Sequence, residues 1–273
     1  MTYEPTDCHE AVIERQTADD GAYGQRNFRE TRNTIAALTR LTRGLARELD
    51  ALQWRSPSHV YNPLRYAWSG YQQYLQRFGA KRGRVLLLGM NPGPWGMAQT
   101  GVPFGNISAV RGWFHIETRL ARKLPTQHPR YPILGMACGR EEGSGQRLWK
   151  WAHERVGTPE QFFDRFFVWN YCPLLFLAKD RNLIPSALKV DERESMEALC
   201  GNALVRAVKL LDPVAIMAIG RYAEHRAQAV VGDARPVGYL LHPSPASPTA
   251  NQHWPEFAER ALGPWLPSRS AQA

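Results

Sequence analysis

Three polar side chains each follow an apolar run that is typical of a buried strand. Asn91 follows "VLLLGM", Asn170 follows "FFVW" and His242 follows "GYLL". None of them is a nucleophile, and no carboxylate or cysteine joins them in the sequence. Amides and an imidazole bind, polarise and position a ligand through hydrogen bonds. One such residue alone is better explained as a turn or cap, but three in the same setting indicate a functional site.

The segments around these residues predict an α/β fold. Short apolar runs typical of parallel strands cover residues 84–91, 165–172, 213–221 and 236–245. Amphipathic helical spacing covers residues 35–52, 196–211 and 220–230. Alternating strands and helices predict a three-layer α/β/α sandwich with a central, mostly parallel sheet. Ligands of such sheets bind beyond the carboxyl ends of the strands, so we expect Asn91, Asn170 and His242 to converge there.

The stretch from Leu86 to Gly105 has an unusual composition for a segment that starts as a strand. It holds five glycines and three prolines. Glycine lets a backbone approach a ligand closely, and proline fixes φ and limits the entropy of a loop. This composition predicts a stiff wall that shapes a pocket at the end of the strand.

The charge of the chain is positive and unevenly distributed. The 273 residues carry a formal net charge of +9 and are 44% hydrophobic, which is enough for a substantial core. Residues 1–30 hold seven acidic residues and three arginines, so the rest of the chain carries +13. We therefore expect residues 1–30 to form an acidic, poorly ordered tail and residues 31–273 to form a single domain. The basic domain favours a polyanionic partner.

Other classes of protein find no support in the sequence. No run of 18 apolar residues could span a membrane, and no signal peptide opens the chain, so we expect neither membrane attachment nor secretion. Cys8, Cys138, Cys172 and Cys200 are far apart, which gives an iron–sulfur cluster no support. The eight histidines show no metal-binding spacing. We expect no metal and no cofactor.

Four segments together resemble a known enzyme family. "GMNPGPWGMAQTGVPFG" and "HPSPASPTANQHW", with "FFVWNYCPLLFLA" and "RNLIPSAL" between them, resemble the single-strand-selective monofunctional uracil-DNA glycosylases of the uracil-DNA glycosylase superfamily. The resemblance extends from about Tyr61 to Leu262. It implies hydrolysis of the N-glycosidic bond of uracil and of 5-oxidised uracils, such as 5-hydroxymethyluracil, in single- and double-stranded DNA. The product is an abasic site, and the enzyme is expected to be a monomer in a bacterial cytoplasm or nucleoid, or in a eukaryotic nucleus.

The resemblance also implies roles for individual residues. Asn91 would position the attacking water, and His242 would stabilise the negative charge that develops on uracil O2. Asn170 would read the base edge, and Phe104 would stack on the flipped base. The main chain from Gly93 to Met97 would line the space beside the uracil 5-position.

The loop after His242 would enter the DNA where the base leaves the helix. Its expected DNA-binding residues are Pro243, Ser244, Pro245, Ala246 and Ser247. Ala246 stands where relatives of this family carry an arginine, which predicts weaker activity on stably paired duplexes than on single strands. Trp95 likewise stands where many relatives have phenylalanine. Phosphate contacts are expected from some of the basic residues at positions 111, 119, 122, 123 and 130, while each of them singly could equally belong to a solvated basic face.

Three alternatives stay open at this stage. The fold could serve a module that binds damaged bases without cutting them, although the presence of both Asn91 and His242 argues against this. A glycosylase of the same fold could act on deaminated purines such as hypoxanthine and xanthine. A metal-dependent hydrolase is the least supported alternative, because the sequence offers no ligand set.

Overall fold

A parallel sheet forms the centre of the protein. The structure, a computed structural model, describes residues 31–268. Four strands lie in the order β3-β2-β6-β7 and are all parallel. Their bounds are β2 Val85–Gly89, β3 Phe166–Asn170, β6 Ala215–Ile219 and β7 Val237–Leu240. Each lies within one of the four runs that the sequence predicted.

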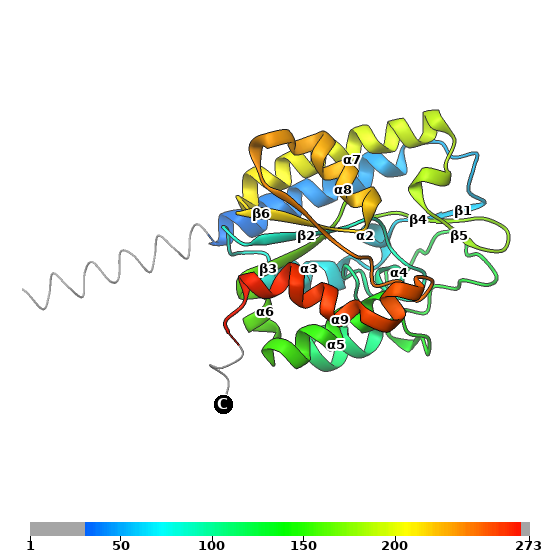
Figure 1. The fold of residues 1–273 in the computed structure, drawn as a ribbon. Coiled ribbons are helices and arrows are strands. Elements are labelled where there is room, and N and C mark those ends of the chain that lie inside the picture. Colours follow the sequence, from blue (N-terminus) through cyan, green and yellow to red (C-terminus); the bar gives the residue numbers. More distant parts are fainter. Residues whose placement is uncertain (1–30, 269–273) are drawn as a thin grey trace, which may run out of the picture.

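Helices cover both faces of this sheet (Figure 1). One face carries a helical segment over residues 31–50, α7 Val190–Leu211 and α8 Arg221–Val231. The other face carries α3 Trp68–Phe78, α5 Gly143–Val156, α6 Pro159–Arg165 and α9 Pro248–Leu262. The predicted three-layer α/β/α sandwich is therefore confirmed.

The leucine spacing of the first helical segment explains why it packs on the sheet. Leu38, Leu41, Leu45 and Leu49 are each at most 3% exposed. Residues three or four apart share one face of a helix, so these side chains form an apolar stripe that is buried in the main hydrophobic core.

A second, smaller sheet was not expected from the sequence. It is antiparallel, in the order β1-β4-β5, with β1 His59–Tyr61, β4 Leu175–Leu177 and β5 Asn182–Leu183. Strands of two or three residues are too short to show a periodic pattern. Short helices complete the fold: α2 Pro63–Tyr66, α4 Met97–Thr100, Ala109–Trp113, Gly135–Ala137, Pro185–Ala187, Gly232–Ala234 and Gly263–Trp265.

The predicted acidic tail, residues 1–30, lies outside the described residues. The division of the chain into a tail and a single domain at residue 30 therefore stays a prediction. None of the helices between residues 31 and 268 is both long and apolar enough to cross a membrane.

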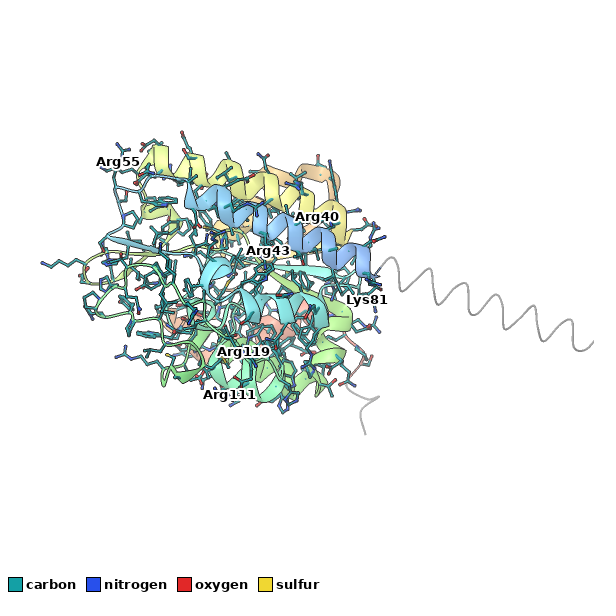
Figure 2. The ribbon with its side chains drawn as sticks, turned by 180° about the vertical axis from the view of Figure 1, so that it is seen from behind. Arg40, Arg43, Arg55, Lys81, Arg111 and Arg119 are labelled. Atoms are coloured by element: carbon teal, nitrogen blue, oxygen red, sulfur yellow. The ribbon has the colours of Figure 1, made fainter. Side chains whose placement is uncertain are left out.

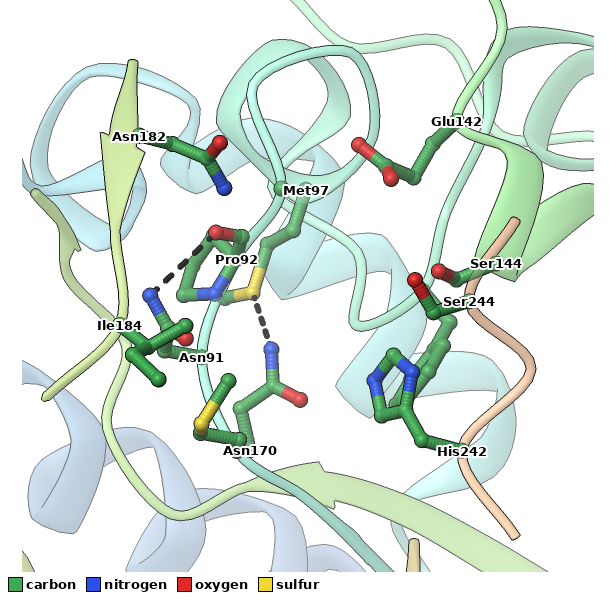
Figure 3. A pocket seen from close by; sticks show the side chains of 13 residues that line it. Asn91, Pro92, Met97, Glu142, Ser144, Asn170, Asn182, Ile184, His242 and Ser244 are labelled. Carbon is green, nitrogen blue, oxygen red and sulfur yellow. Dashed lines mark hydrogen bonds between the residues drawn. The ribbon is translucent and has the colours of Figure 1, made fainter. Parts of the chain in front are cut away.

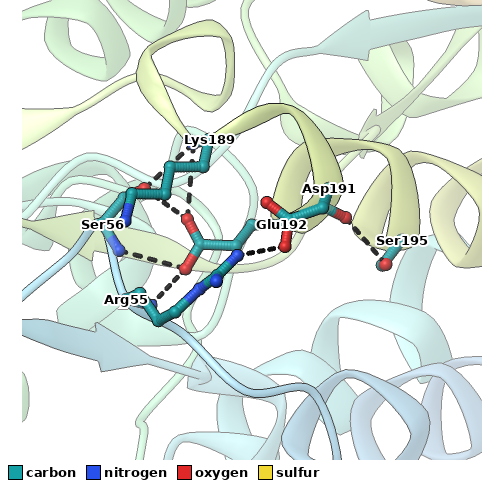
Figure 4. A network of polar contacts seen from close by, with 6 residues as sticks. All are labelled: Arg55, Ser56, Lys189, Asp191, Glu192 and Ser195. Atoms are coloured by element: carbon teal, nitrogen blue, oxygen red, sulfur yellow. Dashed lines mark hydrogen bonds and ion pairs between the residues drawn. The ribbon is translucent and has the colours of Figure 1, made fainter.

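A buried carboxylate joins the start of α7 to the loop after the first helical segment (Figure 4). Glu192 accepts hydrogen bonds from the Ser56 hydroxyl, from the Arg55 and Ser56 backbone N–H groups, and from the Lys189 N–H at 3.3 Å. Burial by itself would raise the pKa of Glu192, but these hydrogen bonds outweigh it and lower the pKa to about 2. The ionised carboxylate therefore stabilises the fold.

We expect Glu192→Gln to destabilise the protein by about 1.5–3 kcal/mol at pH 7, because an amide cannot accept all four of these hydrogen bonds. The ordinary pKa of 4.5 applies to the unfolded chain, so the contribution of Glu192 is present above pH 4.5 and is lost as the pH falls toward 2. Urea denaturation at several pH values measures both effects. Glu194→Gln, at an exposed position of the same helix, is the control; equal losses in both variants would contradict the prediction.

Candidate functional site

The structure brings the three strand-end residues to one pocket. Asn91, Asn170 and His242 line a cavity of about 180 Å³ at the carboxyl edge of the parallel sheet (Figure 3). In the strand order β3-β2-β6-β7, Asn170 ends one edge strand and His242 follows the other, while Asn91 follows β2 between them. The pocket therefore spans the end of the sheet.

The predicted residues Gly93, Met97, Phe104 and Ser244 line the same cavity. Met97 is buried at the start of α4, while Gly93 lies in the glycine- and proline-rich loop between β2 and α4. The stiff wall that the composition predicted thus borders the pocket, next to the three polar side chains.

The Asn91 side chain is fixed by the neighbouring loop. Its Nδ2 donates to the carbonyl oxygen of Leu174 at 3.1 Å and, more weakly, to that of Pro92 at 3.4 Å. This orientation leaves the carboxamide oxygen as the atom that a ligand or a water can use. An amide oxygen accepts hydrogen bonds but takes up no proton at neutral pH, so Asn91 is suited to positioning a reactant.

The Asn170 side chain lies where β2 provides room for it. Gly89 is the register partner of Asn170, and a Cβ at Gly89 would overlap both Asn170 Oδ1 and the Phe104 ring. Asn170 Nδ2 donates to the Met97 sulfur at 3.2 Å, which is a weak acceptor. Asn170 Oδ1 is buried and accepts no hydrogen bond from any residue between positions 31 and 268. Because an unpaired buried polar atom is costly, this oxygen indicates a ligand that donates to it.

Phe104 holds a strained backbone conformation beside the pocket. Its φ is 54°, in the left-handed region that non-glycine residues seldom adopt. The Phe104 carbonyl accepts hydrogen bonds from the Trp149 indole at 2.9 Å and from the Asn106 N–H at 3.0 Å. Such strain persists where the surroundings enforce it, often at functional sites. Here it directs the ring into the cavity, 6.1 Å from the His242 ring.

His242 is held in its uncharged form. Burial lowers its pKa from 6.5 to about 4. The imidazole at neutral pH therefore carries one N–H and no positive charge. It faces the same cavity as Asn170 (Figure 3), so a planar ligand could meet an amide at one end and an imidazole at the other.

A carboxylate also lines the pocket, although none stands beside the three polar residues in the sequence. Glu142 precedes α5, 28 positions before Asn170, the nearest of them in the chain. It accepts a hydrogen bond from the Trp95 N–H at 3.3 Å and occupies the space above Gly93, where a Cβ would overlap it. Burial raises the pKa of Glu142. The feature of the sequence that could have indicated Glu142 is the run "EEGSG". Its small residues let the start of α5 approach the loop that holds Gly93.

Two further pocket residues come from the small sheet. Asn182 lies in β5, and Ile184 follows it with 47% of its surface exposed. Both fall in "RNLIPSAL", a segment noted only for its resemblance. Ser144, in the first turn of α5, completes the polar lining opposite them.

The loop from Pro243 to Ser247 is anchored at the mouth of the pocket. Arg147 donates to the Pro243 carbonyl at 3.1 Å, and Asn251 donates to the Pro245 carbonyl at 2.9 Å. Pro245 and Ala246 are exposed, whereas the Ser247 hydroxyl caps α9 by accepting from Ala250 N–H at 3.2 Å. Ser247 therefore has a structural role in addition to the predicted contact with DNA.

The five basic residues between positions 111 and 130 are exposed, and none lines this pocket. Arg111 pairs with Glu117 at 2.9 Å, and Arg130 donates to the Asp180 carbonyl at 3.0 Å. Arg111 and Arg119 lie on the side of the molecule seen in Figure 2, below Arg40 and Arg43. Within residues 31–268, no three His, Cys, Asp or Glu side chains are placed to hold a metal ion.

Comparisons with known proteins agree on one family. The family model described as "Uracil DNA glycosylase superfamily" matches residues 76–262. A single-strand selective monofunctional uracil DNA glycosylase of Bos taurus is 45% identical over 207 residues, covering 74% of this chain and 76% of the relative. The protein of the same description from Rattus norvegicus is 44% identical over 220 residues, covering 79% of each chain. A crystal structure of Pedobacter heparinus SMUG2 has the same fold, with a TM-score of 0.58, 16% identity, and coverage of 82% of this chain and 96% of that one.

We expect His242→Gln to reduce the loss of stability in mild acid. Below pH 6.5 the unfolded chain protonates this histidine, while the folded protein does so only near pH 4, so stability falls as the pH drops through that window. The contribution amounts to about 2 kcal/mol between pH 7 and pH 5. Urea denaturation at both pH values measures it, with His225→Gln, at an exposed position of α8, as control. A wild-type pH dependence in His242→Gln would show that the imidazole is not held neutral.

Proposed function

This chain belongs to the single-strand-selective monofunctional uracil-DNA glycosylases of the uracil-DNA glycosylase superfamily, and we propose that it removes uracil from DNA by hydrolysis of the N-glycosidic bond, leaving an abasic site. We further propose that it acts on 5-oxidised uracils such as 5-hydroxymethyluracil, and on double-stranded as well as single-stranded DNA. The observation that carries the proposal is the pocket in which a buried, unpaired Asn170 oxygen and an uncharged His242 ring face one cavity.

Base selection rests on Asn170. Its Oδ1, which has no partner among the described residues, is suited to accept from uracil N3–H, and its Nδ2, which donates to the weakly accepting Met97 sulfur, is suited to donate to O4. Cytosine presents an acceptor at N3 and a donor at C4, so it would leave both Asn170 groups unpaired. In a dry site such a mismatch discriminates by about 10⁴–10⁵. The Phe104 ring beside Asn170 provides the stacking surface for the base.

Departure of the base rests on His242. Breaking the glycosidic bond leaves negative charge on uracil and positive charge on the sugar. A neutral imidazole N–H directed at uracil O2 would stabilise the developing anion without reorganisation. The lowered pKa of His242 supports this role, because it keeps the residue a neutral donor at physiological pH.

Water attack rests on Asn91. With Nδ2 committed to the Leu174 carbonyl, the Asn91 oxygen can accept from a water and direct it toward the sugar C1′. Asn91 cannot remove a proton from that water, so the reaction depends on a sugar cation that is electrophilic enough for plain water. Of the described residues that line the pocket, none is a lysine that could form a covalent intermediate, which supports hydrolysis without strand cleavage.

The proposed range of 5-substituents rests on the wall from Gly93 to Met97. Glu142 lies against Gly93 and has one backbone donor, the Trp95 N–H. Its remaining acceptor capacity suits the hydroxyl of a 5-hydroxymethyl group, whereas the methyl of thymine cannot donate a hydrogen bond. We therefore propose Glu142 as a group that favours oxidised substituents over thymine.

The test of the proposed function is a lesion panel. We expect a single-stranded oligonucleotide with one uracil to become alkali-labile after incubation, and the paired duplex to react more slowly because exposed Ala246 cannot fill the gap left by the base. 5-Hydroxymethyluracil should be released and thymine should not. Hypoxanthine and xanthine are tested beside them. Release of the purines without release of uracil would replace the proposal with a purine-specific glycosylase, and equal rates on single strands and duplexes would contradict the role of Ala246.

We expect Asn91→Ala and His242→Ala each to lower single-turnover rates on uracil by about 10²–10³, since each removes a preorganised group of the transition state. Binding of uracil-free DNA, measured by fluorescence anisotropy, should change little. Asn202→Ala and His225→Ala, at exposed positions of α7 and α8, are matched controls. Full activity in both pocket variants would refute the assigned roles.

A further inference from the structure

A second cavity lies beside the first, behind a wall that is one chain segment thick. It has a volume of about 480 Å³ and is lined by Trp95, Arg130, Tyr131 and Arg140, among others. Trp95 stands between Gly93 and Met97, which line the first pocket, and Arg140 is two positions before Glu142, which also lines it. The Trp95 N–H donates to Glu142 at 3.3 Å, so the two segments are joined between the cavities.

The lining of this second cavity combines aromatic rings with positive charge. The Trp95 and Tyr131 rings are 5.6 Å apart at 43°, and the Arg140 guanidinium lies 4.5 Å from the centre of the Trp95 ring. Arg130 and Arg140 are exposed, while Trp95 and Tyr131 are partly buried. Among the residues that the structure describes, no acidic residue lines the cavity. Nucleic-acid bases stack on aromatic rings and on arginine guanidinium planes, and arginines bind phosphates.

The cavity is rigid because one buried glutamine joins its two walls. Gln99, in α4, is 0% exposed. Its Nε2 donates to the Pro94 carbonyl at 2.8 Å and to the Pro132 carbonyl at 3.0 Å. Its Oε1 accepts from the Leu134 and Gly135 N–H groups at 2.8 and 3.0 Å. The Trp95 wall and the Tyr131 wall are thus held at a fixed separation before any ligand arrives.

We propose that this cavity binds an unpaired nucleotide of the DNA strand next to the excised uracil, with its base stacked on the Trp95–Arg140 pair and its phosphate held by Arg130 and Arg140. This inference rests on the proposed function of the neighbouring pocket. Charge complementarity and the shared wall favour single-stranded DNA as the occupant. In a stable duplex the flanking base is paired and stacked, so it cannot enter. The cavity therefore adds affinity for single strands alone and contributes to a preference for them.

The test compares the wild type with Trp95→Ala and Arg140→Gln in the full-length protein. The substrates are two single-stranded oligonucleotides with one uracil, one with natural flanking nucleotides and one whose flanking positions carry tetrahydrofuran in place of bases, and a duplex. Arg43→Ala is the matched control, because Arg43 also stacks on a tryptophan, Trp68, at 4.2 Å, and neither residue lines either cavity. Thermal unfolding checks that each variant is folded.

On the natural single strand we expect kcat/KM to fall about tenfold in Trp95→Ala and in Arg140→Gln, and to stay unchanged in Arg43→Ala. On the strand without flanking bases, the kcat/KM of the wild type should fall to the value that Trp95→Ala has on the natural strand. The kcat/KM of Trp95→Ala should be the same on both strands. On the duplex, the Arg140→Gln variant should match the wild type.

A wild-type kcat/KM in both cavity variants on the natural strand would overturn the inference. The inference would also be overturned if Trp95→Ala lowered kcat/KM, relative to the wild type, by the same factor on the strands with and without flanking bases. A purely structural role of Trp95 predicts that result. Absence of uracil release by the wild type would instead refute the proposed function. In that event, the binding of a uracil-free single strand, measured by fluorescence anisotropy, tests the cavity. The inference then requires that Trp95→Ala bind this strand more weakly than Arg43→Ala does.

Discussion

The register between β2 and β3 is the constraint on which the pocket depends. It sets Gly89 opposite Asn170, and the pairing continues through the Tyr171 N–H, which donates to the Gly89 carbonyl at 2.9 Å. Because side chains alternate between the faces of a strand, a slip by one residue would turn Asn170 away from the cavity. A side chain at position 89 would occupy the space shared by Asn170 and Phe104. Correct strand pairing and the absence of one side chain therefore make room at this end of the pocket, where we propose that the base binds.

Around this floor, burial controls the charge of the pocket. It lowers the pKa of His242 and raises that of Glu142, so both shifts favour the uncharged form. Under the proposed function, the neutral His242 ring donates to the departing base, while Glu142 provides a hydrogen-bonding carboxyl group near Gly93. Positive charge is instead found at the surface and in the neighbouring cavity, where phosphates are expected.

The wall between the two cavities gives the β2–α4 loop a second role. Its glycines let the main chain and Glu142 approach each other on one side, and Trp95 projects to the other. Gln99 fixes this loop to residues 132–135 through four hydrogen bonds. Prolines and a buried amide thus hold one stiff segment between two cavities, which explains why flexible and rigid residues alternate along it.

The sequence by itself determined the sheet strands, the helices that cover them and the placement of Asn91, Asn170 and His242 at strand ends, because hydrophobic periodicity and parallel topology are local or nearly local properties. It did not predict the small antiparallel sheet, whose strands are too short for a pattern, or the capping role of Ser247. It also missed Glu142, and it did not reveal that Arg130 and Arg140 border one cavity with Trp95 and Tyr131. These features join segments that are far apart in the chain, and their distances depend on strand register and helix packing, which only the tertiary structure decides.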